Sequence, residues 1–108
     1  STDGGIVNIE LTYDNRTAKL KIAGNLTPDN SNLFQEKLDE VLNSDADFLK
    51  LDLQNCQNMS SIGVGKILLF CRNFRAKGGD MEVTKCSPEI YELFNMLKLN
   101  QLFTVNQD

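Results

Sequence analysis

The chain has 108 residues, enough for one domain that buries its own core and too few for two. It carries 15 acidic and 11 basic residues, a formal net charge of −4, and no basic tract, so nucleic acids and anionic membranes are not expected partners. It has no histidine, which excludes a Ser-His-Asp or Cys-His catalytic triad, and no apolar run or N-terminal segment typical of a membrane span or signal peptide, so we expect a cytoplasmic protein.

The first half of the chain predicts a hairpin, a helix and a third strand. Residues 6–13 and 17–23 alternate between apolar and polar side chains, and turn residues at 14–16 separate them. Thr27 before Pro28 is typical of a helix N-cap. Apolar side chains then recur at helical spacing up to about residue 43, at Leu33, Phe34, Leu38, Val41 and Leu42. Residues 48–53 form a compact apolar run, which predicts a central strand.

The second half predicts two helices and two strands. A loop rich in Asn, Gln and Ser spans residues 54–61, and a helix from about 62 to 77 ends at a pair of glycines. The core stripe of this helix is Ile67, Cys71 and Phe74, widened by Val64 and Leu68, and we expect either Leu69 or Phe70 to be exposed. Residues 81–84 predict a strand and residues 102–105 a last short one. A helix over 88–97 lies between them, opens at Ser87-Pro88, and has the expected buried face Ile90, Leu93, Phe94 and Leu97.

The element order is therefore β-β-α-β-α-β-α-β. Strands that alternate with helices predict an α/β fold with a mixed, partly parallel sheet and helices packed on it. We expect one domain over residues 1–108, structured from about residue 6 to 105, and a monomer when free.

The three cysteines, Cys56, Cys71 and Cys86, suggest neither a metal site nor a disulfide framework. They are odd in number, lie far apart in the chain, and have no CxxC spacing or histidine beside them. We expect each to be a small buried apolar residue. No cofactor or metal is predicted.

Residues 57–65, Gln-Asn-Met-Ser-Ser-Ile-Gly-Val-Gly, link the apolar strand to the second helix, a position where ligands gather in open α/β sheets. A purely structural explanation is available, because serines cap helices and glycines allow close packing. A functional alternative is that a serine hydroxyl is presented at the helix N-terminus, where a phosphate would be tolerated. The glycines do not form a nucleotide loop, since no upstream glycine and no Ser or Thr after Lys66 complete that motif.

This loop resembles the phosphorylation loop of bacterial anti-sigma factor antagonists, which are STAS domains. The resemblance rests on four motifs in the right order, from about residue 6 to residue 105: Ile22-Ala23-Gly24-Asn25-Leu26; Leu51-Asp52-Leu53 with Met59-Ser60-Ser61-Ile62-Gly63-Val64-Gly65; Lys77-Gly78-Gly79-Asp80-Met81; and Ser87-Pro88-Glu89 with Leu93-Phe94-Asn95-Met96. The family pattern has acidic residues at the positions of Asn25, Thr27 and Ser60, and a hydroxyl residue at Ile62.

The resemblance implies a STAS-like fold and a set of site residues. Ser61, rather than Ser60, matches the phosphorylated serine. The implied partner-binding surface combines the turn before the first helix, the loop, and the exposed side of the second helix, and its predicted residues are Asn25, Thr27, Asn58, Met59, Ser60, Ile62, Gly63 and Lys66.

The resemblance also implies a mechanism, partner switching, in which this chain is not an enzyme. The unphosphorylated protein would bind an anti-sigma factor, usually a GHKL-type serine kinase, and release the sigma factor. Phosphorylation by that kinase would end binding, and a PP2C-type phosphatase would restore it. Two alternatives stay open: a STAS module in another pathway, such as a stressosome-like scaffold, secretion, chemotaxis or lipid transport, and a small enzyme or nucleotide sensor on the same fold.

Overall fold

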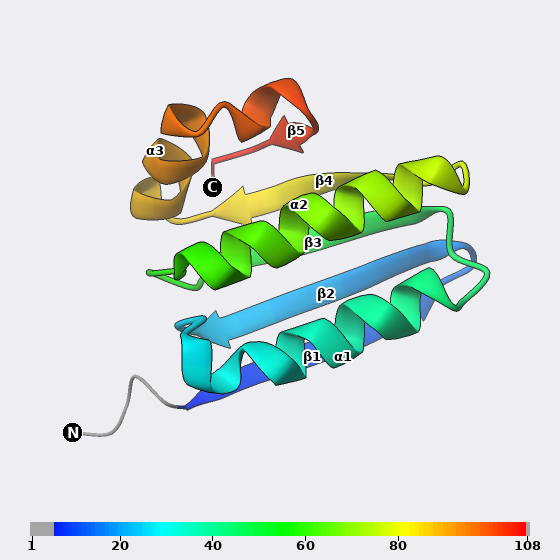
Figure 1. Ribbon diagram of the computed structural model, residues 1–108, viewed down its shortest axis with the longest axis horizontal. Coiled ribbons are helices and arrows are strands. Elements are labelled where there is room, and N and C mark those ends of the chain that lie inside the picture. Colours follow the sequence, from blue (N-terminus) through cyan, green and yellow to red (C-terminus); the bar gives the residue numbers. More distant parts are fainter. Residues whose placement is uncertain (1–5, 108) are drawn as a thin grey trace.

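Five strands form one mixed sheet in the order β1-β2-β3-β4-β5, and the computed structural model describes residues 6–107 (Figure 1). β1 (Val7–Asp14) pairs antiparallel with β2 (Thr17–Gly24). β3 (Phe48–Asn55), β4 (Asp80–Cys86) and β5 (Thr104–Val105) continue the sheet in parallel. The predicted element order and the mixed sheet are therefore confirmed, and the apolar strand β3 is its centre.

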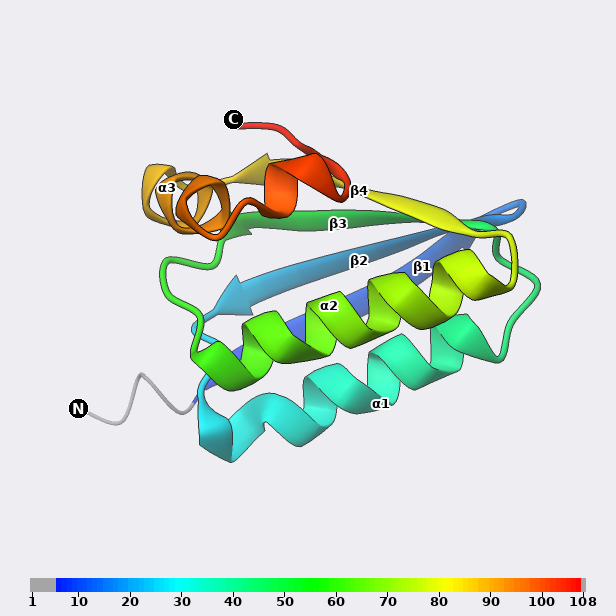
Figure 2. The same ribbon diagram turned by 45° about the horizontal axis from the view of Figure 1, so that its top comes forward.

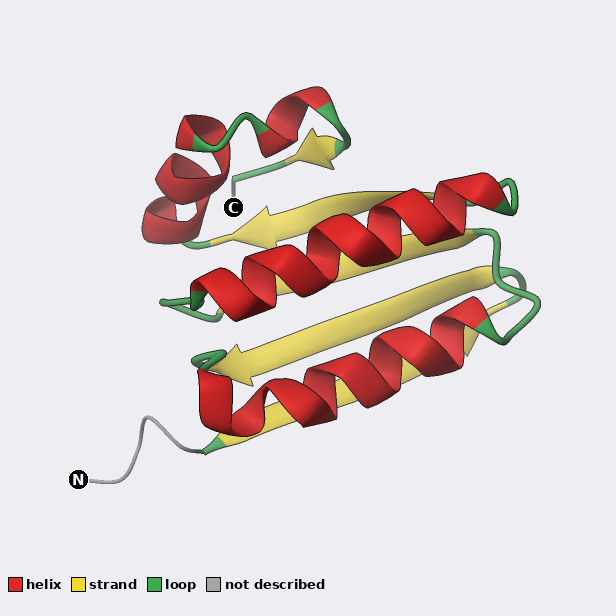
Figure 3. Cartoon of the chain, viewed as in Figure 1, coloured by secondary structure: helices red, strands yellow, loops and turns green. Residues whose placement is uncertain are grey.

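Two helices, α1 (Ser31–Leu42) and α2 (Ser61–Ala76), lie side by side over one face of the sheet (Figures 1 and 2). α3 (Pro88–Met96) and the short helix η3 (Leu99–Gln101) lie beside β4 and β5. Figure 3 shows that α1 and α2 both begin at the end of the sheet where β2, β3 and β4 finish. This arrangement gathers the loops after the parallel strands at one edge. None of the helices within residues 6–107 is long and apolar enough to cross a membrane.

The core lies between the sheet and the helices. Alternate residues of β2, β3 and β4 point inward, while the side chains between them face the open side of the sheet. The largest fully buried side chains include three phenylalanines, one from each α-helix: Phe34, Phe74 and Phe94. All three cysteines are free and buried, as expected. Burial raises the pKa of the Cys86 thiol to about 11.

The helix boundaries differ from the prediction in one physical respect. The segment predicted as a single helix over 28–43 starts with a separate 3-10 turn, η2 (Pro28–Asn30), and the α-helix begins only at Ser31. Thr27 is the N-cap of that turn, with Pro28 at its first position. The last strand is shorter than predicted, because the N–H groups of Leu102 and Phe103 bond back to Leu99 in the turn that ends η3, and only Thr104 and Val105 pair with β4.

The predicted buried face of α3 is partly wrong. Ile90 and Phe94 are buried, but Leu93 is half-buried and Leu97 is 48% exposed. The helix ends at Met96, and Lys98 turns the chain with a φ of 62°, so the helical period no longer applies to Leu97. Leu99 enters the core in its place.

α1 and α2 each expose one leucine from their apolar positions. Leu33, one of the apolar positions on the predicted α1 stripe, is 49% exposed. Of the pair in α2, Leu69 is exposed, whereas Phe70 is buried and stacks on Phe74 at 4.8 Å between ring centroids.

Candidate functional site

Three chain segments meet at the carboxyl ends of the parallel strands. Residues 25–30 follow β2, residues 56–60 follow β3, and Ser87 follows β4 and opens α3. Ligand and partner sites of open α/β sheets form at this edge because the loops there are free to vary. The predicted loop 57–65 lies here, as the sequence indicates.

Backbone hydrogen bonds join the first two segments. Leu26 and Met59 form an isolated parallel bridge. The N–H of Leu26 donates to the Asn58 carbonyl at 3.2 Å, and the N–H of Ser60 donates to the Leu26 carbonyl at 2.8 Å. The turn after β2 and the loop after β3 are therefore one hydrogen-bonded unit.

Asparagine side chains complete this unit. The Asn58 N–H donates to Asn25 Oδ1 at 3.1 Å, and Asn30 Nδ2 donates to the Asn25 carbonyl at 2.8 Å. The Thr27 N–H donates to Asn30 Oδ1 at 2.9 Å, as in a capping box, but the buried Thr27 hydroxyl has no hydrogen bond of ordinary geometry among the described residues. Asn30 was not singled out from the sequence, and its place three residues after Thr27 is the pattern that points to it.

The two serines of the loop have different surroundings. Ser60 is the N-cap of α2, and its Oγ accepts a hydrogen bond from the Gly63 N–H at 3.4 Å. Ser61 is the first residue of the helix, is exposed, and its hydroxyl makes no hydrogen bond to any residue within 6–107. The first turn of α2 carries no acidic side chain, and its helix dipole and free N–H groups favour negative charge at Ser61.

Met59 and Gly63 are both buried and determine how closely the loop packs against α2. A Cβ added at Gly63 would lie 2.7 Å from Met59 Cγ and 3.5 Å from Leu26 Cβ. Only glycine therefore fits at this position without displacing Met59. These two residues shape the loop from inside, whereas Asn58, Ser61 and Ile62 form its exposed part.

The outer side of α2 continues the exposed surface away from Ser61. Ile62 is 45% exposed and Leu69 is 49% exposed. Gly65 lies between them and is also exposed, with no atom within 4 Å of a Cβ built on it. Residues 62, 65 and 69 share one side of a helix, so they form an apolar strip with a notch at Gly65.

Lys66 lies beside this strip but does not point freely into solvent. It is half-buried, and its Nζ donates to Gln35 Oε1 of α1 at 3.0 Å. Lys66 thus bridges the two helices, a role that the spacing of residues in the sequence does not reveal.

Ser87 connects the third segment to the loop. Its Oγ donates to the Cys56 carbonyl at 3.2 Å and accepts a hydrogen bond from the Ile90 N–H at 3.3 Å. The Cys56 thiol in turn donates to the Asn58 carbonyl at 3.3 Å, and burial raises its pKa, which keeps it protonated. A continuous set of hydrogen bonds therefore runs from α3 through the loop to the turn after β2.

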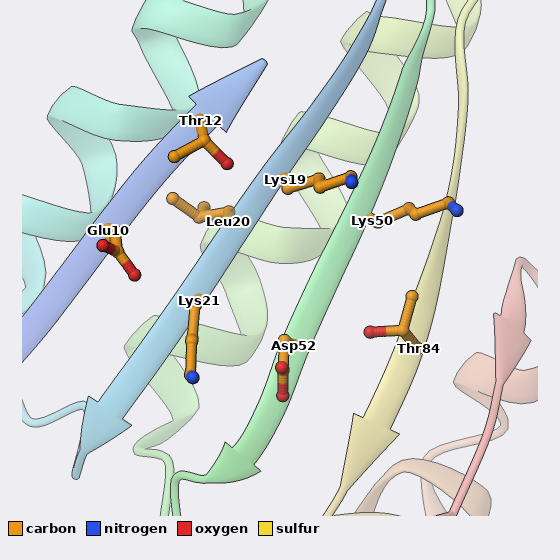
Figure 4. A pocket seen from close by; sticks show the side chains of 8 residues that line it. All are labelled: Glu10, Thr12, Lys19, Leu20, Lys21, Lys50, Asp52 and Thr84. Carbon is orange, nitrogen blue, oxygen red and sulfur yellow. The ribbon is translucent and has the colours of Figure 1, made fainter. Parts of the chain in front are cut away.

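A separate concavity of about 230 Å³ lies on the open face of the sheet, away from the loop. Side chains from β1 to β4 line it (Figure 4). Glu10, Lys21 and Asp52 occupy paired positions on adjacent strands, so charges of opposite sign alternate across this face. No group of three or more potential metal ligands occurs within residues 6–107.

The family of the protein follows from comparison with known sequences. A family model described as "STAS domain" matches residues 8–108. The chain belongs to the STAS-domain family. A relative in Paenibacillus polymyxa, described as an anti-sigma F factor antagonist, is 26% identical over 100 residues, which cover 92% of this chain and 86% of the relative.

Solved structures of anti-sigma factor antagonists share the fold of this STAS domain. The anti-sigma factor antagonist SpoIIAA in its unphosphorylated form superposes with a TM-score of 0.80 at 19% identity, covering 92% of this chain and 88% of that one. The phosphorylated form of SpoIIAA, a Bacillus protein, gives 0.74 at 18% identity, covering 92% and 91%. An anti-sigma factor antagonist from Mycobacterium paratuberculosis gives 0.80 at 12% identity, covering 94% and 86%. At these identities the likeness establishes the fold and not the activity.

Proposed function

We propose that this STAS domain is an anti-sigma factor antagonist whose binding is switched off by phosphorylation of Ser61. In this proposal the unphosphorylated domain binds an anti-sigma factor of the GHKL serine-kinase type and thereby releases a sigma factor. The kinase then transfers a phosphoryl group to Ser61, and a PP2C-type phosphatase removes it. The domain itself acts in the cytoplasm as a binding protein and supplies no catalytic group.

The observation that carries the proposal is the contrast between Ser60 and Ser61. A kinase needs a hydroxyl that reaches its active site, and Ser61 is exposed with an unengaged hydroxyl at the first position of α2. The Ser60 hydroxyl is occupied as the helix cap. The name of the Paenibacillus relative and the family resemblance of the loop support the same assignment.

The physical effect of the phosphate is local. It adds about −1.5 to −2 charges at neutral pH, and the N-terminus of α2 stabilises negative charge. The fold is therefore retained while the exposed surface becomes anionic. A partner that places phosphates of a bound nucleotide or its own carboxylates near Ser61 would then face like charges at a poorly solvated interface, which costs several kcal/mol.

The proposed partner surface combines the exposed part of the loop with the apolar strip of Ile62, Gly65 and Leu69. Exposed apolar side chains beside a switchable serine suit an interface with an apolar centre and a polar rim. The turn of Asn25 and Thr27 supports this surface, because its hydrogen bonds fix the position of residues 58–60.

The test is phosphorylation in vitro by the GHKL-type kinase that copurifies with the protein, followed by peptide mapping. We expect the label on Ser61 in the wild type and in Ser60→Ala, and none in Ser61→Ala. Ser61→Asp should lose kinase binding in part, since one carboxylate carries less charge than a phosphate, whereas Ser61→Ala should bind and resist switching. Label on Ser60 alone would contradict the site. A kinase that binds but labels neither serine would indicate a STAS module that works without phosphorylation.

A further inference from the structure

The outer edge of β1 has no strand paired to it within residues 6–107. β1 is the first strand in the sheet order and pairs only with β2, in continuous register from Val7 opposite Gly24 to Asp14 opposite Thr17. The strand is eight residues long and has neither a proline nor a bulge. The opposite edge of the sheet is different, because β5 has only two residues. Long, regular edges of this kind are templates for pairing with another strand.

The hairpin identifies which backbone groups point outward. Only Asn15 and Arg16 separate the two strands, so the closing pair of Asp14 and Thr17 is a hydrogen-bonded pair. Such pairs alternate along an antiparallel ladder, which directs the N–H and C=O groups of residues 8, 10, 12 and 14 toward β2. Those of Val7, Ile9, Leu11 and Tyr13 face the free edge.

The side chains along this edge are apolar on the helix side of the sheet. Val7, Ile9 and Leu11 are half-buried, and Tyr13 is 43% exposed, with its hydroxyl donating to Glu40 of α1 at 3.2 Å. Leu33 stands two helical turns before Glu40 and so lies on the same flank of α1, where it is 49% exposed. Apolar area therefore borders the unpaired backbone.

We propose that β1 pairs, antiparallel and about a two-fold axis, with β1 of a second copy of this chain, with Leu11 opposite Leu11 of the second copy. The register follows from the strand sequence. With Leu11 at the axis, Ile9 faces Tyr13 and Glu10 faces Thr12 across the interface. Apolar residues thus oppose apolar ones, and no two like charges are directly opposed.

The neighbouring registers are less favourable. An axis at Glu10 sets two carboxylates opposite each other, and an axis at Thr12 sets Glu10 opposite Asp14. An axis at Ile9 pairs only residues 7–11 and so satisfies fewer backbone groups. Registers shifted by one residue would oppose side chains from different faces of the sheet. Among these registers, only the Leu11 register pairs most of the strand, sets apolar side chains opposite apolar ones and avoids directly opposed like charges.

Pairing in this register joins the two sheets into one of ten strands and brings the two α1 helices, with Leu33 and Tyr13, beside each other. Glu10 and its copy lie on a diagonal, and each copy carries a net charge of −4. Salt screens this repulsion, so the dimer strengthens as ionic strength rises. The outer side of α2, with Ser61, stays uncovered, and the inference therefore does not depend on the proposed function.

The experiment measures mass by sedimentation and amide hydrogen exchange by NMR, both on the wild-type chain from micromolar to millimolar concentration. We expect the mass of the monomer at micromolar concentration and a mass that approaches twice 12.1 kDa at millimolar concentration. The amides of Ile9, Leu11 and Tyr13 should then become protected, while those of Asn8, Glu10 and Thr12, bonded to β2, are protected throughout. A monomer at every concentration, or a dimer that leaves the outward amides unprotected, overturns the proposal.

Two variants test the register. Leu11→Lys places like charges at the axis and should weaken the dimer by about tenfold. Glu10→Gln removes the diagonal repulsion without touching the edge, and it should tighten the dimer and reduce its salt dependence. Circular dichroism shows whether Leu11→Lys folds, and if it does not, Glu10→Gln decides alone. Unchanged association in Glu10→Gln at low salt would contradict the Leu11 register.

Discussion

The Ser87 hydroxyl lies 3.2 Å from the carbonyl oxygen of Cys56, thirty-one residues earlier in the chain, and donates a hydrogen bond to it. The Ser87 hydroxyl oxygen also accepts a hydrogen bond from the Ile90 N–H at the start of α3. One buried side chain thus caps a helix and donates a hydrogen bond to a backbone carbonyl of the loop that carries the candidate site. It connects the stability of α3 with the shape of that loop.

Ser87→Ala should therefore destabilise the protein by about 1–3 kcal/mol, because it removes a helix cap and leaves a buried carbonyl without its donor. Urea unfolding measures the change. Ser87→Thr keeps both hydrogen bonds and is the matched control. Equal losses in the two variants would show that packing around residue 87, and not the hydroxyl, matters.

The two glycines of α2 should respond in opposite ways to alanine. Gly63→Ala places a methyl group 2.7 Å from Met59 Cγ, so it should lower the free energy of unfolding and displace the loop. Gly65→Ala meets no atom and raises helix propensity, so it should stabilise the domain by about 0.5–1 kcal/mol. If the partner packs into the notch at Gly65, as the proposed surface implies, the more stable variant should bind less tightly. Isothermal titration with the kinase measures this, and unchanged affinity would remove Gly65 from the interface.

Phe94 and Leu97 form a second matched pair. Phe94 is fully buried, and Phe94→Ala should cost about 3–5 kcal/mol. Leu97 is half exposed just after the end of α3, and Leu97→Ala should cost less than about 1 kcal/mol. Denaturant unfolding of both variants measures the two losses of stability. If Leu97 were buried with Phe94, as the helical periodicity of the sequence predicts, both substitutions would cost a large amount of stability.

This pair also shows how far the sequence predicts the fold. Alternation in β1 and β2 and the apolar run of β3 predict the strands, because side chains of a strand alternate between two faces. Ser87-Pro88 predicts the start of α3, since capping is a local property. The end of α3, in contrast, is not determined by a capping motif in the adjacent sequence. It depends on the left-handed turn at Lys98 and on Leu99 filling the core, and neither has a sequence pattern as strong as a glycine stop.

The candidate site also has features that the sequence predicts and features that it does not. The position of Ser61 at the start of α2 is predicted by the strand, loop and helix that surround it. The bond from the Asn58 N–H to Asn25 joins residues thirty-three apart, and the bridge from Lys66 to Gln35 joins residues thirty-one apart. Polar contacts between residues so distant in the chain have no periodicity, and only the folded structure reveals them.

Cys86 should make the stability of the domain fall at alkaline pH. Burial raises its pKa from 9.0 to about 11, so the folded state holds the thiol proton that the unfolded chain releases. Its contribution is complete below pH 9 and is lost as the pH rises toward 11. Cys86→Ala should unfold more easily at neutral pH but lose less stability between pH 9 and 11 than the wild type. Parallel pH profiles in the two proteins would contradict this origin of the slope.

Lys66→Glu tests whether the charge beside the apolar strip contributes to binding. The substitution reverses a charge near Ser61 and also breaks the hydrogen bond to Gln35, so we expect it to weaken kinase binding and to cost about 0.5–1.5 kcal/mol of stability. Gln35→Ala is the matched control, because it breaks the same bond and leaves the lysine in place. If binding depends on the charge, Gln35→Ala should bind like the wild type and the effect of Lys66→Glu should shrink as salt is added. Equal loss of affinity in both variants, independent of salt, would instead show that the bond acts by holding α1 against α2, and that Lys66 serves the site through the position of the helix.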